Sequence, residues 1–202
     1  MPLRQGDRAL SSGRDGDLLT SVRLETERLG LRPPVPDDAD AVAELLADPE
    51  VMRFIGGRVV PRDDVPQVIE RWLARWAANR MGPFMLERLD DGLLVGRCGI
   101  LVWDPRDWRQ STLADAGEFA QPELGWALAR THWGRGYATE AARAVGNWAR
   151  TDRRVGSLVS IIAPENIASS RVAERLGARP GETVHLPDAG DAVVWRHADE
   201  LG

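Results

Sequence analysis

The chain has 202 residues, of which 43% are hydrophobic and 28% are charged, as is usual for a single folded domain with a hydrophobic core. The formal net charge is −5, and because a duplex nucleic-acid site needs clustered basic residues, we expect no nucleic-acid partner. No run approaches the ~20 apolar residues of a membrane-spanning helix. The N-terminus also lacks the apolar segment of a secretory signal. We therefore expect a cytoplasmic protein with no membrane partner.

Cysteine and histidine are too few and too scattered to form a metal site. The single cysteine, Cys98, excludes an intrachain disulfide, and it falls in a strand-like run that favours a buried, inert thiol. The three histidines, His132, His185 and His197, lie far apart in the sequence. We expect no metal, and we expect His132 to be a surface residue of a loop.

The first part of the chain predicts a tail, a strand and two helices. Residues 1–20 are rich in Gly, Ser, Asp and Arg and predict a flexible tail before one domain over residues 21–202. Residues 28–33 alternate like a half-buried strand. Asp37 or Asp38 is placed to cap a helix that stops before Pro49. Apolar residues at helical spacing, Trp72 and Trp76 among them, predict a second helix over residues 62–79.

The middle of the chain predicts a hairpin and a long loop. Residues 83–89 and 93–103 read as strands joined by an Asp-Asp-Gly turn at residues 90–92. Residues 104–121 show no period, and loops of that length are usually functional or disordered. Trp103 and Trp108 flank this loop and suit the walls of a substrate pocket.

The last part alternates strands and helices: strand 123–129, helix 137–150, strand 157–163, helix 166–176 and strand 192–197. The whole order predicts an α/β (α+β) fold, a mixed sheet with helices on its faces.

The segment Trp-Gly-Arg-Gly-Tyr-Ala-Thr-Glu at residues 133–140 places Gly134 and Gly136 immediately before a predicted helix. Glycines let the backbone approach a ligand closely, and the unpaired N–H groups of a helix N-terminus attract phosphate. A dinucleotide fingerprint would need a third glycine where Thr139 stands, and the Gly-Lys-Ser/Thr of a P-loop is absent. The Gly-x-Gly pair by itself also fits a turn that merely shapes a loop.

Four segments in order, residues 24–39, 123–128, 133–141 and 166–177, resemble the GNAT superfamily of N-acetyltransferases. Within it they look most like the branch that contains the ribosomal-protein alanine N-acetyltransferases. The resemblance implies a single-domain, mostly antiparallel central sheet with splayed central strands. It also implies transfer of an acetyl group from acetyl-CoA to a primary amine, on a protein N-terminus or a small molecule, by direct attack in a ternary complex.

The same resemblance implies where acetyl-CoA binds. A strand backbone would pair with the pantetheine arm, loop N–H groups and one hydroxyl would hold the pyrophosphate, and a side-chain amide would bind the pantetheine. These coenzyme-binding residues are Trp126, Ala127, Leu128, His132, Trp133, Gly134, Arg135, Gly136, Tyr137, Ala138, Thr139 and Asn166.

Two residues are candidates for the chemistry. By the family geometry, Glu123 would face the amine pocket and assist deprotonation, although a surface acid paired with an arginine fits equally well. Ser169 would donate a hydrogen bond to the leaving thiolate, or serve only as a polar residue at a helix start. Glu140, in a first helical turn, suits the helix dipole and is expected to be structural.

The sequence departs from the family pattern at three positions. Thr131 stands where Arg or Gln is common, Ala173 replaces a common tyrosine, and Ala178 replaces a phenylalanine. Arg130 or Arg135 would compensate for the first. These departures leave two alternatives open: an acyl-CoA-binding sensor without activity, and transfer from a longer donor such as succinyl-CoA with its carboxylate on an arginine. Exposed sheet edges would also allow a homodimer.

Overall fold

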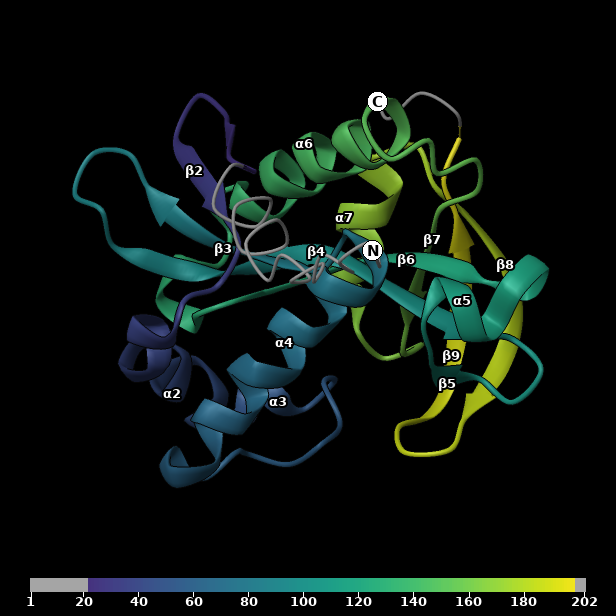
Figure 1. The fold of residues 1–202 in the computed structure, drawn as a ribbon, viewed down its shortest axis with the longest axis horizontal. Coiled ribbons are helices and arrows are strands. Elements are labelled where there is room, and N and C mark those ends of the chain that lie inside the picture. Colours follow the sequence, from purple (N-terminus) through teal and green to yellow (C-terminus); the bar gives the residue numbers. More distant parts are fainter. Residues whose placement is uncertain (1–21, 199–202) are drawn as a thin grey trace, which may run out of the picture.

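The computed structural model describes residues 22–198, and the predicted tail of residues 1–20 lies outside that range. Within it, the strands form one nine-stranded sheet in the order β1-β2-β3-β4-β6-β7-β9-β8, with β5 paired to β4 (Figure 1). Only the β6–β7 contact is parallel among these pairs. The predicted mixed, mostly antiparallel sheet flanked by helices is confirmed.

The strands, helices and short 3₁₀ helices (η) follow one another in the order β1 (Leu24–Glu25), β2 (Leu29–Arg32), η1 (Pro36–Asp38), α2 (Ala39–Ala47), α3 (Pro49–Met52), η2 (Arg62–Asp64), α4 (Val65–Asn79), β3 (Pro83–Arg88), β4 (Leu94–Asp104), β5 (Arg109–Gln110), α5 (Leu113–Ala116), η3 (Gly117–Phe119), β6 (Gln121–Leu128), η4 (Arg130–His132), α6 (Tyr137–Thr151), β7 (Val159–Ile162), α7 (Ile167–Arg175), β8 (Arg179–Leu186) and β9 (Gly190–Arg196). In the part of the chain that the structure describes, no helix has the length and apolar character needed to cross a bilayer.

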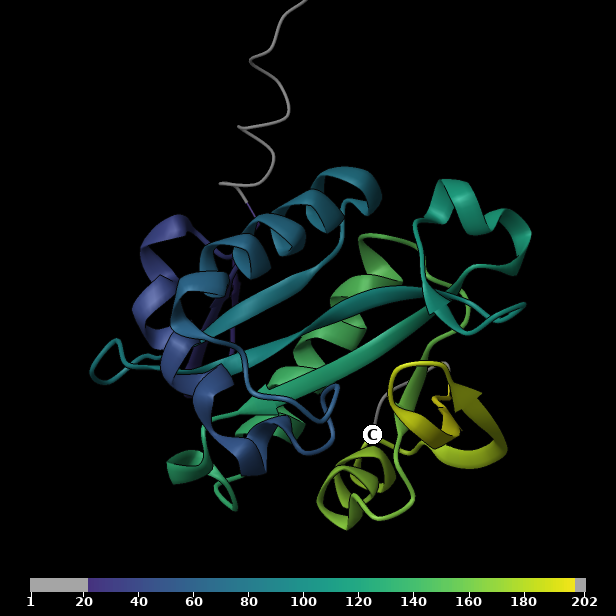
Figure 2. The same ribbon diagram turned by 90° about the horizontal axis from the view of Figure 1, so that it is seen from below.

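Helices cover both faces of the sheet, and α4 and α6 lie on opposite sides of the strands (Figure 2). One buried cluster joins α6 and α7 to the sheet face that carries Leu86 and Leu124. A second joins α2, α3 and α4 to the face that carries Met85 and Ala127. Because strand side chains alternate between faces, β3, β4 and β6 each contribute to both layers.

The two tryptophans that helped to predict the second helix are core residues. Trp72 and Trp76 are 5% and 2% exposed. The Trp76 ring meets Phe84 edge-on at 4.8 Å between centroids and Trp148 of α6 at 5.7 Å. Cys98 is fully buried, and burial raises the pKa of its thiol to about 12. The predicted burial of this thiol is therefore confirmed.

The prediction missed strand β8, which pairs with β9 to form a C-terminal hairpin. Its sequence, Arg-Pro-Gly-Glu-Thr-Val-His-Leu, begins with residues that disfavour strands, and most of its side chains are exposed. An edge strand of this kind is specified by its long-range partner, so a local pattern does not reveal it.

The sequence suggested that residues 104–121 are irregular throughout, and the structure shows that they are not. They contain β5, α5 and η3, and the carbonyl oxygen of the Asn79 side chain accepts a hydrogen bond of 2.8 Å from the Leu113 amide, which ties α5 to the end of α4. Two acids of this segment have local partners, since Asp104 pairs with Arg106 and Asp115 accepts from Thr112. The segment is a mixed-charge excursion from the sheet.

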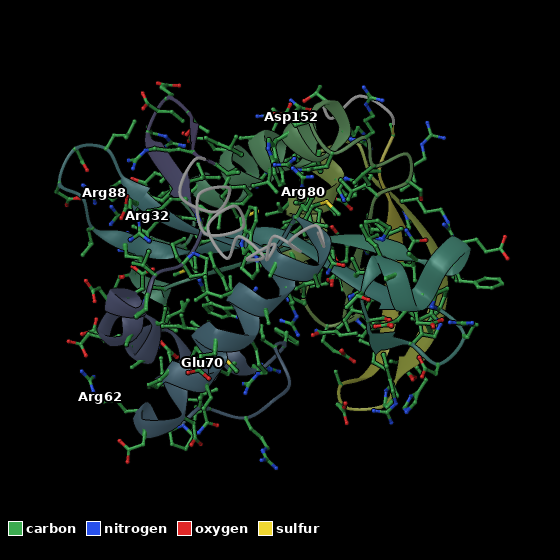
Figure 3. The ribbon with its side chains drawn as sticks, viewed as in Figure 1. Arg32, Arg62, Glu70, Arg80, Arg88 and Asp152 are labelled. Atoms are coloured by element: carbon green, nitrogen blue, oxygen red, sulfur yellow. The ribbon has the colours of Figure 1, made fainter. Side chains whose placement is uncertain are left out.

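Asp38 occupies the N-cap position of α2, but its carboxylate does not cap that helix. The side chain is 5% exposed and accepts from Arg32 Nη1 and Nη2 at 2.9 and 2.6 Å and from the Val35 amide at 2.8 Å. Arg32, labelled in Figure 3, also donates to Glu87 on β3 at 2.8 Å. Asp38 therefore joins the start of α2 to the sheet.

We expect Asp38→Ala to lower the free energy of unfolding by about 2–3 kcal/mol, because it removes charge-assisted hydrogen bonds and leaves Arg32 with one acceptor fewer. Urea denaturation measures the change. Asp37→Ala is the matched control: its side chain is exposed, so a change within about 0.5 kcal/mol is expected there. Equal effects of the two substitutions would contradict the role given to Asp38.

Candidate active site

Strands β6 and β7 separate after a single register pair, Glu123 with Val159. On its other edge β6 stays paired with β4 along its whole length. The predicted splaying of the central strands is therefore present, and the edge of β6 beyond Glu123 is open.

Backbone groups of β6 face this opening at alternate residues. The Leu124 carbonyl points into it, where it accepts a hydrogen bond of 2.6 Å from the Ser160 hydroxyl. Trp126 and Leu128 face the same way, and the Leu128 carbonyl accepts from Trp133 Nε1 at 2.7 Å. By the same alternation the backbone groups of Ala127 face β4, where Ala127 is level with Arg97. Of the three β6 residues predicted to bind a pantetheine, Trp126 and Leu128 therefore present backbone groups to the gap and Ala127 does not.

Two glycines shape the loop before α6. Gly134 and Gly136 have φ of 73° and 83°, in the left-handed region that side chains disfavour. The amides of His132 and Trp133 donate to the carbonyls of η4 and its preceding residue. The amides of residues 134–139 have no hydrogen-bond partner within residues 22–198. The free donors are therefore a run that begins at Gly134 and continues into the first turn of α6, which has no side-chain cap.

The start of the described chain orients this loop. Glu140 accepts from the Thr26 hydroxyl at 2.7 Å and from Arg28 Nε at 2.7 Å. Arg28 Nη1 donates to the Arg135 carbonyl at 3.0 Å, and its guanidinium lies 4.7 Å from the Tyr137 ring centroid. Because C=O and N–H point in opposite directions across a trans peptide, the Gly136 amide is turned away from Arg28. Glu140 is structural, as predicted.

A cavity of about 390 Å³ lies against this loop, and we call it the loop cavity. Eleven of the twelve residues predicted to bind the coenzyme line it: Trp126, Ala127, Leu128, His132, Trp133, Gly134, Gly136, Tyr137, Ala138, Thr139 and Asn166. The exception is Arg135, which contributes its carbonyl to Arg28. His132 is 8% exposed, so the expectation of a surface histidine was wrong; burial lowers the pKa of its imidazole, as does the nearby Arg135 charge.

Asn166 caps α7 and borders the loop cavity. Its Oδ1 accepts from the Ser169 amide at 3.1 Å, which leaves the Nδ2 donors of the same side chain directed elsewhere. Thr131, which stands where the family commonly has Arg or Gln, is exposed. Arg130, one of the two arginines expected to compensate, is paired with Asp48 at 3.2 Å.

Glu123 lies at the last contact between β6 and β7 and is 8% exposed. Its carboxylate accepts a hydrogen bond from Trp103 Nε1. Burial raises the pKa of Glu123, while the Trp103 hydrogen bond and the positive charge of Arg97 oppose that shift. The alternative of a surface acid paired with an arginine is therefore excluded.

A second cavity, of about 530 Å³, contains this carboxylate, and we call it the Glu123 cavity. Trp103 and Trp108 form part of its wall, as the sequence suggested. Both cavities are bordered by the same five residues, Phe54, Ile55, Trp126, Asn166 and Ser169. The two cavities therefore adjoin at the opening between β6 and β7, with Ser169 at the junction.

Sequence reasoning missed three contributors to the Glu123 cavity. Phe54 and Ile55 come from the segment after α3, and residues 186–189 come from the unrecognised β8–β9 turn. Arg97, inside β4, is the third. A charged residue in the interior of an otherwise apolar strand was the available signal for Arg97. Across residues 22–198, no three His, Cys, Asp or Glu side chains are grouped as metal ligands.

Comparison with known sequences decides the family. The sequence model of the acetyltransferase (GNAT) domain matches residues 28–179, which include the loop, Glu123 and α7. The chain belongs to the GNAT family of acetyltransferases. It is an acyl-CoA-dependent acetyltransferase, and acetyl-CoA is the co-substrate of its family.

Individual relatives support this assignment. The acetyltransferase is 32% identical over 180 residues to the uncharacterized protein YkkB of Bacillus subtilis strain 168, covering 87% of this chain and 95% of YkkB. It is 28% identical to the uncharacterized N-acetyltransferase p20 of Bacillus licheniformis, over 76% of this chain and 80% of p20. An acetyltransferase crystal structure from Agrobacterium tumefaciens str. C58 superposes with a TM-score of 0.71 at 30% identity, covering 96% and 99% of the two chains. These matches are compatible with the ribosomal-protein alanine branch and do not single it out.

We expect Glu123→Gln to raise the melting temperature at neutral pH. The folded state raises the pKa of Glu123, so the stability contributed by its protonated form is present at low pH and is lost as the pH rises through the folded pKa. The neutral amide avoids that loss, and the advantage of the variant should grow between pH 4 and pH 8. Scanning calorimetry of both proteins across this range measures it, with exposed Glu118→Gln as control. An advantage that is absent or independent of pH would contradict the shift.

Proposed function

We propose that the enzyme transfers an acetyl group from acetyl-CoA to a primary amine, on a protein N-terminus or a small molecule, by direct attack in a ternary complex. The observation that carries the proposal is the pair of adjoining cavities. One contains a run of free amides suited to phosphate, the other contains a buried carboxylate, and they share a border at Ser169. The thioester and the amine would therefore meet directly, and the acetyl group would not need to be attached to an enzyme side chain on the way.

The coenzyme occupies the loop cavity in this proposal. The free amides of residues 134–139 and the Thr139 hydroxyl bind the pyrophosphate, assisted by the positive end of the α6 dipole. The pantetheine extends along the open edge of β6, where Trp126 offers an N–H and a carbonyl. The Nδ2 of Asn166 donates to a pantetheine carbonyl, because its Oδ1 is already bound to α7.

The acceptor amine enters the Glu123 cavity. An alkyl ammonium has a pKa near ~10 and must lose a proton before it attacks. Glu123, whose pKa is raised by burial, accepts that proton through a water molecule. The amine nitrogen then bonds to the thioester carbon, the C–S bond breaks, and the electron pair leaves on sulfur, with the Ser169 hydroxyl as hydrogen-bond donor to the thiolate. The proton that remains in excess on the nitrogen passes through water to the thiolate, which gives the neutral amide and the free thiol.

We expect Glu123→Gln to lower kcat by about 100-fold or more, in the range of a lost general base, with little change in the dissociation constant of acetyl-CoA. Steady-state kinetics and calorimetric titration separate the two quantities. Trp103→Phe is the matched control, because it removes the hydrogen bond to the carboxylate and retains the carboxylate. That bond opposes the rise in the pKa of Glu123, so its loss should move the acidic limb of the pH–rate profile to higher pH. An unchanged kcat in Glu123→Gln would remove the role.

We expect Gly134→Trp to weaken acetyl-CoA binding at least ~100-fold, since a good part of the ligand's contact surface is lost when an indole fills the cavity. A Cβ at Gly134 would meet no atom within 4 Å, so the cavity has room for the side chain. Gly92→Trp is matched in backbone, with φ of 71° against 73° and the same open space, but it lies in the β3–β4 turn outside both cavities. Calorimetric titration of the two variants distinguishes occlusion from strain, and similar affinities in both would contradict the placement of the coenzyme.

The two alternatives differ in how well the site supports them. A sensor without activity would need no carboxylate in the second cavity, and the buried Glu123 held by Trp103 favours an enzyme. A longer donor such as succinyl-CoA requires a cation for its carboxylate. The Glu123 cavity is lined by two cations, Arg97 and Arg109, and the second is paired with Asp188.

A further inference from the structure

Arg97 is a charged side chain without a polar partner in the Glu123 cavity. It projects from the middle of β4 and lines the cavity. Its Nε is shielded from solvent and makes no hydrogen bond. Among residues 22–198 no carboxylate lies within 4.0 Å of its guanidinium nitrogens. A shielded guanidinium N–H normally has a hydrogen-bond acceptor, because the loss of water around it is costly.

The surroundings of Arg97 do not supply that partner. The face of the Trp72 ring lies 5.4 Å from its guanidinium carbon, which covers the cation without accepting a directed hydrogen bond. Burial lowers the pKa of Arg97, with Glu123 attracting its charge and Arg75 repelling it. Arg75 has an acceptor of its own in Gln110. The local excess is therefore positive: two guanidinium groups accompany one carboxylate.

The other charges of the cavity are already matched. Arg109 and Asp188 also border it, and they pair with each other at 3.8 Å. Arg97 and Glu123 remain as the two charges available to a ligand. The cavity therefore offers one site for a cation and one for an anion.

The spacing of these two charges suits a ligand that carries both. On neighbouring strands Arg97 is level with Ala127, four residues from Glu123 and on the same face of the sheet, so the two backbones are about 13 Å apart along the strand direction. Both side chains are long enough to shorten this separation. The residue between them is Gly125, and Glu123 Oε1 lies 3.6 Å from the position a Cβ would take there. The Glu123 carboxylate therefore lies over Gly125, on the side of Arg97, which brings the two charges closer together than their backbones are.

We propose that the acceptor is a zwitterion: a primary amine that also bears a carboxylate, with the carboxylate bound by Arg97 and the amine directed to Glu123. This inference rests on the proposed acetyl transfer and narrows its acceptor. The planar guanidinium binds a carboxylate through two parallel hydrogen bonds, which fixes orientation as well as charge. A free amino acid or a short peptide with a free C-terminus has this chemistry.

The position of Arg97 assigns the carboxylate to the acceptor and not to the acyl donor. Arg97 lines the Glu123 cavity and is not among the residues that line the loop cavity. A carboxylate on the donor would have to cross the junction at Ser169 and pass the attacking amine. An amine that enters from the Glu123 cavity reaches Arg97 directly.

The test compares acids with their amides. Free amino acids and dipeptides are assayed beside the same compounds with C-terminal amides, using acetyl-CoA and succinyl-CoA as donors. The acids should exceed their amides in kcat/KM by at least ~10-fold, the size of a charge-assisted interaction. In Arg97→Gln the value for acids should fall by about 100-fold, and that for amides by less than about 3-fold. The dissociation constant of acetyl-CoA should not change.

Two variants control for charge and folding. Arg75→Gln removes a neighbouring positive charge that does not line the cavity, so it should retain the preference for acids. Arg97→Lys keeps the positive charge but loses the planar pair of N–H donors, so it should retain only part of the preference for acids that Arg97→Gln loses. Melting curves show which variants are folded, and Arg97→Lys carries the test if Arg97→Gln does not fold.

Three outcomes would overturn the inference. Equal rates for acids and amides in the unaltered enzyme would do so, and would leave acetyl transfer itself intact. If the Arg97 substitutions lower the rate with succinyl-CoA but do not affect the preference for acidic acceptors, Arg97 binds the carboxylate of the acyl donor and the inference is wrong. Failure to acetylate any amine, with acetyl-CoA still bound, would overturn the proposed function and this inference together.

Discussion

The separation of β6 from β7 is the constraint on which the site depends. A strand in the middle of a sheet normally has both edges paired, because unpaired backbone groups away from water are costly. Here the pairing stops at Glu123, and substitutes complete the opening: the Ser160 hydroxyl binds the Leu124 carbonyl, and Trp133 binds that of Leu128. The groups of Trp126 lie between them. The fold thus leaves a short length of strand edge for a ligand to pair with, and both cavities meet there.

The loop beside this edge is held in shape before any ligand arrives. Thr26 and Arg28 reach it from the beginning of the described chain and meet Glu140 and the Arg135 carbonyl. These contacts fix the orientation of a peptide unit, so that its donor is not free to turn toward a competing acceptor. Pre-oriented donors need little reorganisation on binding, which preserves affinity. The Glu140 carboxylate in the first turn of α6 would repel an anion at the N-terminus of the helix, and the Arg28 ion pair offsets its charge.

Much of the fold and of the loop cavity could be predicted, because both depend on local patterns. The apolar period of α4, the hairpin turn between β3 and β4 and the two glycines before α6 are visible in short windows of sequence. What could not be predicted depends on contacts between distant segments. Strand β8 exists through its pairing with β9, and the shielding of Arg97 depends on Trp72 from α4. The burial of Glu123 likewise follows from Trp103, twenty residues away.

The ion pair between Arg109 and Asp188 has a consequence for access to the Glu123 cavity. It joins the excursion after β4 to the turn between β8 and β9, two segments that are remote in sequence and meet at the border of the Glu123 cavity. Both side chains are largely in water, where such a contact contributes little and is weakened further by salt. The border of the Glu123 cavity can therefore open at this point at small energetic cost, and higher ionic strength favours the opening.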